Sequence, residues 1–404
     1  MKLNLIILAL VTAAMAAATG HAKPLKVYVL VGQSNMQGHA TVQMLEGMAA
    51  DPETKPLYDK IADADGKPRT FEDVRMAALS GTLEAPVTKS GPLTVGYGGG
   101  LTGSPGASGK NALKFGPELG FGVTMREHRK EPFLVIKAAW GGKSLRQDFL
   151  SPSGVPVVGG DAKTGAYYEA MRDHVRAVLA DPAKYVPGYD PQQGVEMAGF
   201  VWFQGWNDMM GAKDPLYAAT ADKPAFAAYG ELLAHFIRDV RKDFNAPEMP
   251  FVIGVIGTGG DPKSDNPFRK AMAAPAALPE FKGNVVAVHA AEYFDEKLGE
   301  LVDRSWRWQR PAWDPENKYV ELRAKLAPLQ KQLDEAKKLP TQEERAKVQR
   351  ETQKQMNDIM YTPEDLKYLA MNKSNQGYHY FGSGKILGRV GEAFAKAMIQ
   401  IEKR

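Results

Sequence analysis

The run from Lys26 to Val31 is the feature that most restricts how this chain can fold. It reads Lys-Val-Tyr-Val-Leu-Val and is ended by Gly32. An apolar, β-branched run of this length is typical of a parallel strand that is buried on both faces. Such a strand needs helices on each side of its sheet, so the run predicts an α/β fold.

Strand and helix patterns alternate along most of the remaining chain. Short apolar runs predict strands at residues 132–139, 195–204, 250–257 and 284–289. Amphipathic spacing predicts helices at residues 117–129, 166–180, 225–244 and 382–401. Residues 35–111 show no sustained pattern, and the Gly- and Ser-rich stretch 90–110 predicts a loop. The alternation predicts a three-layer α/β/α fold with a central parallel sheet.

Residues 314–358 interrupt this alternation. They are rich in Lys, Glu, Gln and Arg, with leucines spaced by four, three and four. Pro328 falls inside the predicted helix and should kink or split it. Thr341 and Glu344 form a capping-box pattern after Pro340. The segment is therefore predicted to be an inserted, charged helical hairpin, either solvated or packed against a partner.

The first 22 residues predict a signal peptide. Lys2 precedes an uncharged apolar stretch, and Gly20 and Ala22 provide small residues for cleavage before Lys23. The expected domain is then residues 23–404, exported to the periplasm or the medium of a bacterium.

Composition excludes several classes of function. The chain has no cysteine, which excludes disulfides, a thiol nucleophile and a lipoprotein anchor. Its net charge of +4 is too small to argue for nucleic acid or a membrane surface as partner. No later apolar run is long enough to span a membrane.

Ser34 follows the first predicted strand, at the edge where open α/β sheets bind ligands. A serine nucleophile needs a base, and histidine is the usual one. His379 lies in a loop before the last predicted helix, and His289 ends a predicted strand. A loop at that edge of the sheet could bring a base to Ser34, which favours His379 over His289, whereas His39 lies beyond the serine turn with no evident partner. The remaining mature histidines fall in predicted helices among charged neighbours and are expected at the surface: His128, His174 and His235.

Acyl transfer also needs hydrogen-bond donors for the developing oxyanion. Two further predicted strand ends supply candidates. Gly141 and Gly142 can each present a backbone N–H, and Asn207 can offer its side-chain amide.

These blocks together resemble the SGNH hydrolases. Residues 32–36, the glycine at 141 or 142, the Gly-Trp-Asn-Asp segment 205–208 and His379 occur in the order typical of that superfamily. The likeness is to its sialate O-acetylesterase and acetylxylan-esterase-related branch, and residues 115–118 and 138–145 are also similar to that branch. The resemblance spans most of residues 25–404 apart from the charged insertion. It implies an SGNH or flavodoxin-like fold, no metal or other cofactor, and an acetylated carbohydrate as substrate.

The resemblance also implies a role for each matching residue. Ser34 would attack the ester, and His379 would accept its proton. The Ser34 N–H, a glycine N–H at Gly141 or Gly142, and the Asn207 amide would hold the oxyanion. The other polar or aromatic residues of the blocks become candidates for substrate contact: Gln33, Glu118, Gln204 and Trp206.

Two positions depart from the family pattern. Trp206 stands where the branch usually has glutamate, and Gln376 stands where the family has aspartate, three residues before its histidine. The candidates to replace that acid are Glu292, Asp295 and Asp208. The alternatives are a Ser–His dyad without an acid, a carbohydrate-binding protein that has lost turnover, and a lipid or aryl esterase on the same scaffold. The oligomeric state is left open.

Overall fold

The structure is a computed structural model that describes residues 23–258, 266–314 and 316–403. Its centre is a seven-stranded sheet with the order β4-β3-β6-β1-β7-β8-β9. The strands are β1 (Leu25–Gly32), β3 (Phe71–Gly81), β4 (Pro86–Leu93), β6 (Phe133–Ala139), β7 (Val195–Phe203), β8 (Phe251–Val255) and β9 (Val285–His289). All neighbours run parallel except the edge strand β4, which is antiparallel to β3.

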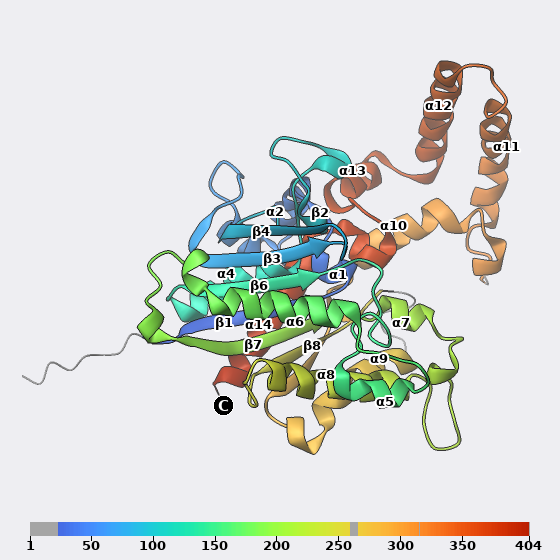
Figure 1. Cartoon of the computed structure of the whole chain (residues 1–404). Coiled ribbons are helices and arrows are strands. Elements are labelled where there is room, and N and C mark those ends of the chain that lie inside the picture. Colours follow the sequence, from blue (N-terminus) through green and yellow to red (C-terminus); the bar gives the residue numbers. More distant parts are fainter. Residues whose placement is uncertain (1–22, 259–265, 315, 404) are drawn as a thin grey trace, which may run out of the picture.

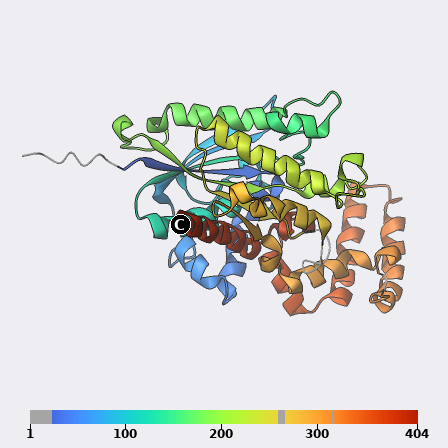
Figure 2. The ribbon, with the colours of Figure 1, turned by 90° about the horizontal axis from the view of Figure 1, so that it is seen from below.

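Helices cover both faces of this sheet (Figure 1). Viewed from below, α6 (Ala166–Ala180) and α8 (Ala227–Asp243) lie on one face, and α4 (Pro117–Arg129) and α14 (Gly384–Glu402) lie on the other (Figure 2). The shorter helices of the body are α1 (Ser34–Gln37), α2 (Leu45–Ala50), α3 (Lys55–Ile61), α5 (Val155–Val158), α7 (Trp206–Met210) and α9 (Pro267–Ala273). The predicted three-layer α/β/α fold is confirmed.

The central position of β1 follows from its composition. Its residues Val27 to Val31 are fully buried between β6 and β7. At its end, a Cβ on Gly32 would lie 2.1 Å from the carbonyl oxygen of Phe203, so only glycine fits against β7. This close approach places the following residues directly at the carboxyl edge of the sheet.

The prediction of no regular structure in residues 35–111 was wrong. This region contains α2, α3, β3 and β4, and β2 (Ala40–Thr41) pairs with β5 (Lys114–Phe115). Strand β4 starts at Pro86, before the predicted loop of residues 90–110, and its last residues, Ser90–Leu93, fall within that loop. Its exposed, proline-containing sequence lacks the apolar run of a central strand, because an edge strand is partnered on one side only.

The charged segment forms an arm that projects from the body (Figure 1). It consists of α11 (Val320–Ala336) and α12 (Gln342–Met360), and α10 (Glu296–Arg307) and α13 (Pro363–Asn372) connect it to the sheet. The capping box of Thr341 and Glu344 is present at the start of α12. Pro328, however, lies inside α11 without ending it.

The arm has a small apolar core of its own at its base. Leu326 and Met356 from the arm pack with Leu301 and Trp308 from the α10 region. The arm is therefore anchored to the body by apolar contacts, while its tip is exposed and charged.

The predicted signal peptide, residues 1–22, lies outside the described residues. Within the described part of the chain, no helix combines the length and the hydropathy needed to cross a bilayer.

Candidate active site

Ser34 is the first residue of α1 and directly follows the turn at the end of β1. The turn is fixed by both neighbouring strands: the Gln33 N–H donates to the Phe203 carbonyl (3.2 Å), and the Trp140 N–H donates to the Gly32 carbonyl (3.2 Å). Ser34 is 8% exposed. The serine is thus held on a rigid support with only limited access to solvent.

The candidate oxyanion donors lie at the same edge. A Cβ added to Gly141 would lie 3.8 Å from the Cβ of Ser34, so this glycine is adjacent to the serine. Gly142 has a left-handed φ of +72°, and its carbonyl accepts a hydrogen bond from the Asn207 amide. The structure therefore brings together residues from the ends of β1, β6 and β7, while their role in binding an oxyanion stays a prediction.

His379 lies in the turn η12 (Gly377–Gly382), which packs against α1. The turn reverses direction through left-handed conformations at Tyr380 and Phe381. The Ser374 hydroxyl, just before the turn, lies 3.0 Å from the His39 carbonyl and accepts from the Thr41 N–H (3.2 Å). These contacts hold the histidine loop against the segment that follows Ser34.

The ring of His379 is oriented by an amide. Its Nδ1 lies 2.9 Å from Oδ1 of Asn375. The same Oδ1 accepts from the backbone N–H of Gln376 (2.7 Å), which identifies it as the oxygen of the amide. Nδ1 must therefore carry the ring proton, and Nε2 is left as the basic nitrogen.

Two aromatic rings flank His379. His39 stacks on it with ring centroids 4.2 Å apart and an interplanar angle of 18°. Tyr378 meets it edge-on at 4.4 Å, and Trp206 lies next to Tyr378 at 5.9 Å. Burial lowers the pKa of His379 to about 4. The ring is thus neutral at ordinary pH, as a general base must be.

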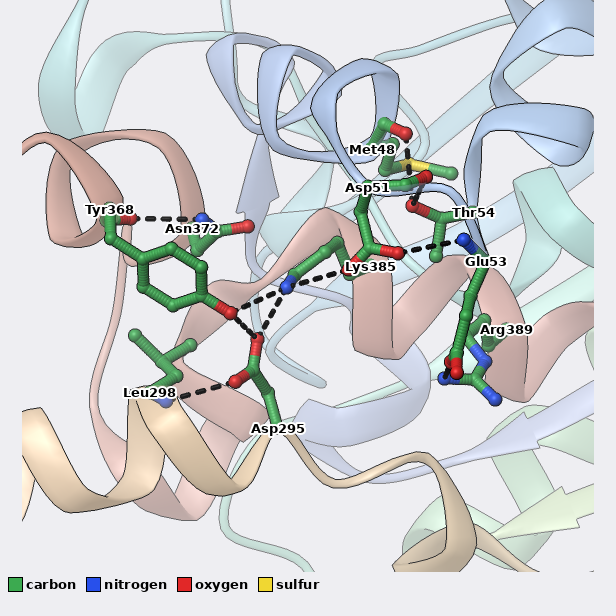
Figure 3. Close-up of polar contacts among 10 residues, drawn as sticks. All are labelled: Met48, Asp51, Glu53, Thr54, Asp295, Leu298, Tyr368, Asn372, Lys385 and Arg389. Carbon is green, nitrogen blue, oxygen red and sulfur yellow. Dashed lines mark hydrogen bonds and ion pairs between the residues drawn. The ribbon is translucent and has the colours of Figure 1, made fainter. Parts of the chain in front are cut away.

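Asp295, one of the predicted acids, is engaged elsewhere (Figure 3). Its carboxylate accepts from the Leu298 N–H (2.9 Å) and the Tyr368 hydroxyl (2.7 Å), and pairs with Lys385 (2.6 Å). Asp295, Tyr368 and Lys385 line, together with Asp51, a cavity of about 800 Å³ whose lining includes neither Ser34 nor His379. In this structure Asp295 caps α10 and anchors the start of α14.

Asp208 is also placed in a different network. It is fully buried and accepts from the Leu145 N–H (2.8 Å), the Gln204 amide (2.7 Å) and the Tyr217 hydroxyl. Burial raises its pKa, and these hydrogen bonds oppose that change. Its carboxylate ties the loop after β6 to the start of α7.

Glu292 is exposed in the turn after β9, and Gln376 is exposed beside the histidine loop. The side chain that contacts His379 Nδ1 is therefore Asn375, which the sequence analysis missed. The only sequence signal was its spacing of four residues before the histidine, because the aspartate pattern directs attention to position 376.

Three of the four predicted substrate contacts are internal supports. Gln33 and Gln204 are buried, and Gln33 Oε1 accepts from the Gln204 amide (3.3 Å) and the Gly205 N–H (3.2 Å). Glu118 is fully buried in an ion pair with Lys137 (2.6 Å). The Lys137 ammonium also donates to the carbonyls of Gln37 (2.9 Å) and Tyr97 (2.8 Å), so this pair supports the end of α1. Trp206 alone among the four is partly exposed.

The other histidines are spread over the body. His128 and His289 are exposed, but His174 and His235 are partly buried, which corrects the expectation that they lie at the surface. His174 Nε2 lies 3.4 Å from the Ala77 carbonyl, and His235 Nδ1 lies 2.9 Å from the Ser153 hydroxyl. Within the described ranges, no three His, Asp or Glu side chains gather where they could hold a metal ion.

The mostly parallel sheet, its two helical layers and the serine turn at its carboxyl edge define an α/β protein of the SGNH type. A family model described as carbohydrate esterase, sialic acid-specific acetylesterase, matches residues 24–298. The chain therefore belongs to this family of carbohydrate esterases. The matched range includes Ser34, Gly142 and Asn207 and ends before the arm and His379.

Solved structures give weaker similarities. A protein from Arabidopsis thaliana is 18% identical with a TM-score of 0.38, over 66% of this chain and 86% of that one. A carbohydrate acetylesterase from Xanthomonas citri is 15% identical with a TM-score of 0.38, over 70% of this chain and 55% of that one. A carbohydrate esterase family 2 enzyme with a carbohydrate-binding domain, from Corynascus thermopiles (Myceliophthora fergusii), is 13% identical with a TM-score of 0.28, over 66% and 57%. A comparison with curated proteins found no match.

Proposed function

We propose that this chain is a serine esterase that removes O-acetyl groups from a carbohydrate. The observation that carries the proposal is the orientation of His379, whose Nδ1 faces an amide oxygen and whose Nε2 is therefore the free base. The histidine turn packs against the helix that begins with Ser34. Acyl transfer requires a nucleophile and an oriented neutral base, and these two packed elements carry such a pair of residues.

In the proposed mechanism, Ser34 Oγ attacks the acetyl carbon while His379 Nε2 takes its proton. The carbonyl oxygen becomes an oxyanion, which the N–H groups of Ser34 and Gly142 and the Asn207 amide stabilise. The imidazolium then gives its proton to the departing sugar oxygen as the C–O bond breaks. Water attacks the acetyl-serine with His379 again as base, and acetate and free Ser34 result.

The substrate class follows from family membership and from the aromatic wall of the site. Trp206 and Tyr378 lie beside the histidine and are partly or well exposed. Each of these side chains has an apolar ring face and a polar N–H or O–H group, so it can pack against the C–H face of a sugar ring and hydrogen-bond to its hydroxyls. A sialate or an acetylated plant or algal polysaccharide is the substrate we propose, and the predicted signal peptide would export the enzyme to meet it.

The test is acetate release from acetylated xylan, O-acetylated sialic acid and p-nitrophenyl acetate by one preparation. Ser34→Ala should lower turnover at least about a thousandfold, as loss of a serine nucleophile does elsewhere. Ser305→Ala, at an exposed serine of α10, is the matched control and should leave turnover unchanged. Hydrolysis at the wild-type rate by Ser34→Ala would remove Ser34 from the mechanism.

One observation favours a second candidate, a carbohydrate-binding protein that has lost turnover. The partner of His379 is a neutral amide, which cannot neutralise an imidazolium with a full charge. In the serine-protease example, replacing the triad aspartate with its amide costs about four orders of magnitude in turnover. Binding of acetylated sugars by a wild-type protein that is inert on all three substrates would support this candidate.

A further inference from the structure

His39 is the least explained group near the histidine base. It follows α1 by two residues, and its ring stacks on that of His379. Its Nε2 atom is buried and has no hydrogen-bond partner among the described residues. A buried polar atom without a partner is costly, so its presence at a site calls for a physical reason.

The backbone around His39 is tightly constrained. Gly38 has a φ of +78°, and a Cβ there would lie 2.0 Å from the Cα of Gly116. The Gly38 carbonyl accepts from the Gly99 N–H (2.7 Å). On the other side, the Ser374 hydroxyl lies within hydrogen-bond distance of the His39 carbonyl. These contacts fix the backbone of His39, from which its ring stacks on His379.

Burial and nearby positive charges keep the His39 ring neutral. Burial, first, and then repulsion from a protonated His379, from Lys114 and from Lys137 lower the pKa of His39 to about 3. Its ring therefore remains a neutral aromatic surface when His379 takes up a proton. A neutral aromatic face attracts a cation placed over it. The hydrogen-bond partner of His379, the Asn375 amide, is itself neutral and does not offset the charge of the imidazolium.

We propose that His39 is a positioning residue for His379. Its stacked ring keeps the base in the plane set by Asn375 and stabilises the imidazolium that forms during acyl transfer. This inference rests on the proposed esterase function, and it assigns to a stacked histidine part of the role that a carboxylate has in related sites.

The first test uses His39→Ala and His39→Phe, measured on p-nitrophenyl acetate. His39→Ala should lower kcat about tenfold with little change in KM, because one cation–aromatic contact in the transition state is lost. His39→Phe keeps a ring over His379 and should restore kcat to within about threefold of wild type on the same grounds. His128→Ala, at an exposed histidine, is the matched control.

The second readout is the acid limb of the kcat/KM profile. In wild type it should fall near the His379 pKa of about 4. His39→Ala removes the ring that stabilises the imidazolium, so the limb should move to lower pH, whereas His39→Phe should leave it unchanged. A change that only admits water to His379 would move the limb the other way, toward the ordinary pKa of about 6.5.

A third readout is independent of activity. Proton and carbon NMR of the imidazole Cε1–H groups in Ser34→Ala follows the titration of His379 with and without His39→Phe or His39→Ala. A lower His379 pKa in His39→Ala alone supports the inference even if no ester is hydrolysed, and in that case only the proposed function fails. A raised His379 pKa in that variant would contradict the proposed stabilisation of the imidazolium. Unchanged titration together with wild-type kcat in His39→Ala would overturn the inference.

Discussion

At the residue scale, the contact between His379 Nδ1 and the Asn375 amide sets how well the base works. Asn375→Asp would place a carboxylate at the same position, 2.9 Å from Nδ1 in the present structure. A negative charge there stabilises the imidazolium, so kcat should rise about tenfold or more. The same charge favours protonated His379, so the acid limb of kcat/KM should move to higher pH.

Gln376→Asp is the matched control for this prediction. It restores the aspartate at the position where the family has one, but the side chain of residue 376 is exposed. We expect it to leave kcat nearly unchanged. Acceleration by Gln376→Asp and not by Asn375→Asp would show that the loop adopts the family arrangement when it functions.

The residues of the site illustrate what sequence reasoning can and cannot reach. Ser34 was predictable because an apolar strand ending in glycine delivers the next side chain to the sheet edge. The proximity of His39 to His379 was not predictable, because the two residues are 340 positions apart in the sequence and the η12 turn brings them together. Left-handed conformations at Tyr380 and Phe381 build that turn, and neither residue type signals such a conformation.

At the element scale, the start of α14 is fixed by a buried charge network (Figure 3). Lys385 bonds to Asp295 (2.6 Å), Asp51 (3.0 Å) and the Tyr368 hydroxyl (2.7 Å), and its side chain is 9% exposed. Lys385→Met would leave two carboxylates facing each other without a cation. Removing one member of a buried pair typically costs about 3–5 kcal/mol, and we expect a loss of that order in the free energy of unfolding from urea titration.

Arg389→Met, one turn further along α14, is the control for that loss. Its pair with Glu53 (2.7 Å) lies at the surface, where the two side chains are 32% and 69% exposed. Exposed pairs contribute about 0–1 kcal/mol, so this change should be nearly neutral. Equal, small losses in both variants would show that solvent screens the Lys385 network as well.

The arm was predictable as helices but not in how it is anchored. Its charged sequence gives α11 and α12, whereas the contacts of Leu326 and Met356 with Trp308 come from tertiary packing.

Replacing residues 332–349 with a short Gly-rich turn should leave the thermal midpoint and p-nitrophenyl acetate hydrolysis unchanged. Leu326→Ala, at a fully buried position, should instead lower stability by about 2–5 kcal/mol. Loss of activity or of an oligomer in the shortened protein would assign the tip a partner.

At the scale of the whole molecule, the parallel sheet and its two helical layers followed from periodicity, since strands buried on both faces have long apolar runs. The edge strand β4 did not, because exposure on one side replaces that run with polar residues and prolines. Burial likewise could not be predicted from the sequence for the polar residues near the site. Gln33, Gln204 and Glu118 looked like substrate contacts in the sequence, and only the three-dimensional packing shows them to be internal.

The stability of the whole molecule should depend on pH through its partly buried histidines. The pKa values of His39 and His379 are lowered to about 3 and about 4, and burial also lowers the pKa of His174. Between about pH 6.5 and pH 4 the unfolded chain therefore binds protons that the folded chain does not, and the free energy of unfolding falls as the pH falls. Each such histidine contributes a slope of at most about 1.4 kcal/mol per pH unit.

Asp208 contributes a pH dependence of the opposite sign: burial raises its pKa, so its contribution to the free energy of unfolding increases as the pH falls. In a comparison of wild type with His39→Phe, the contributions of Asp208 and of all other shared groups cancel. Urea titrations of both proteins between pH 7 and pH 4.5 should give a shallower dependence on pH for His39→Phe, since one of the titrating rings is gone. Parallel curves for the two proteins would show that His39 is protonated in the folded state as readily as in the unfolded chain, which would contradict its neutral, buried position against His379.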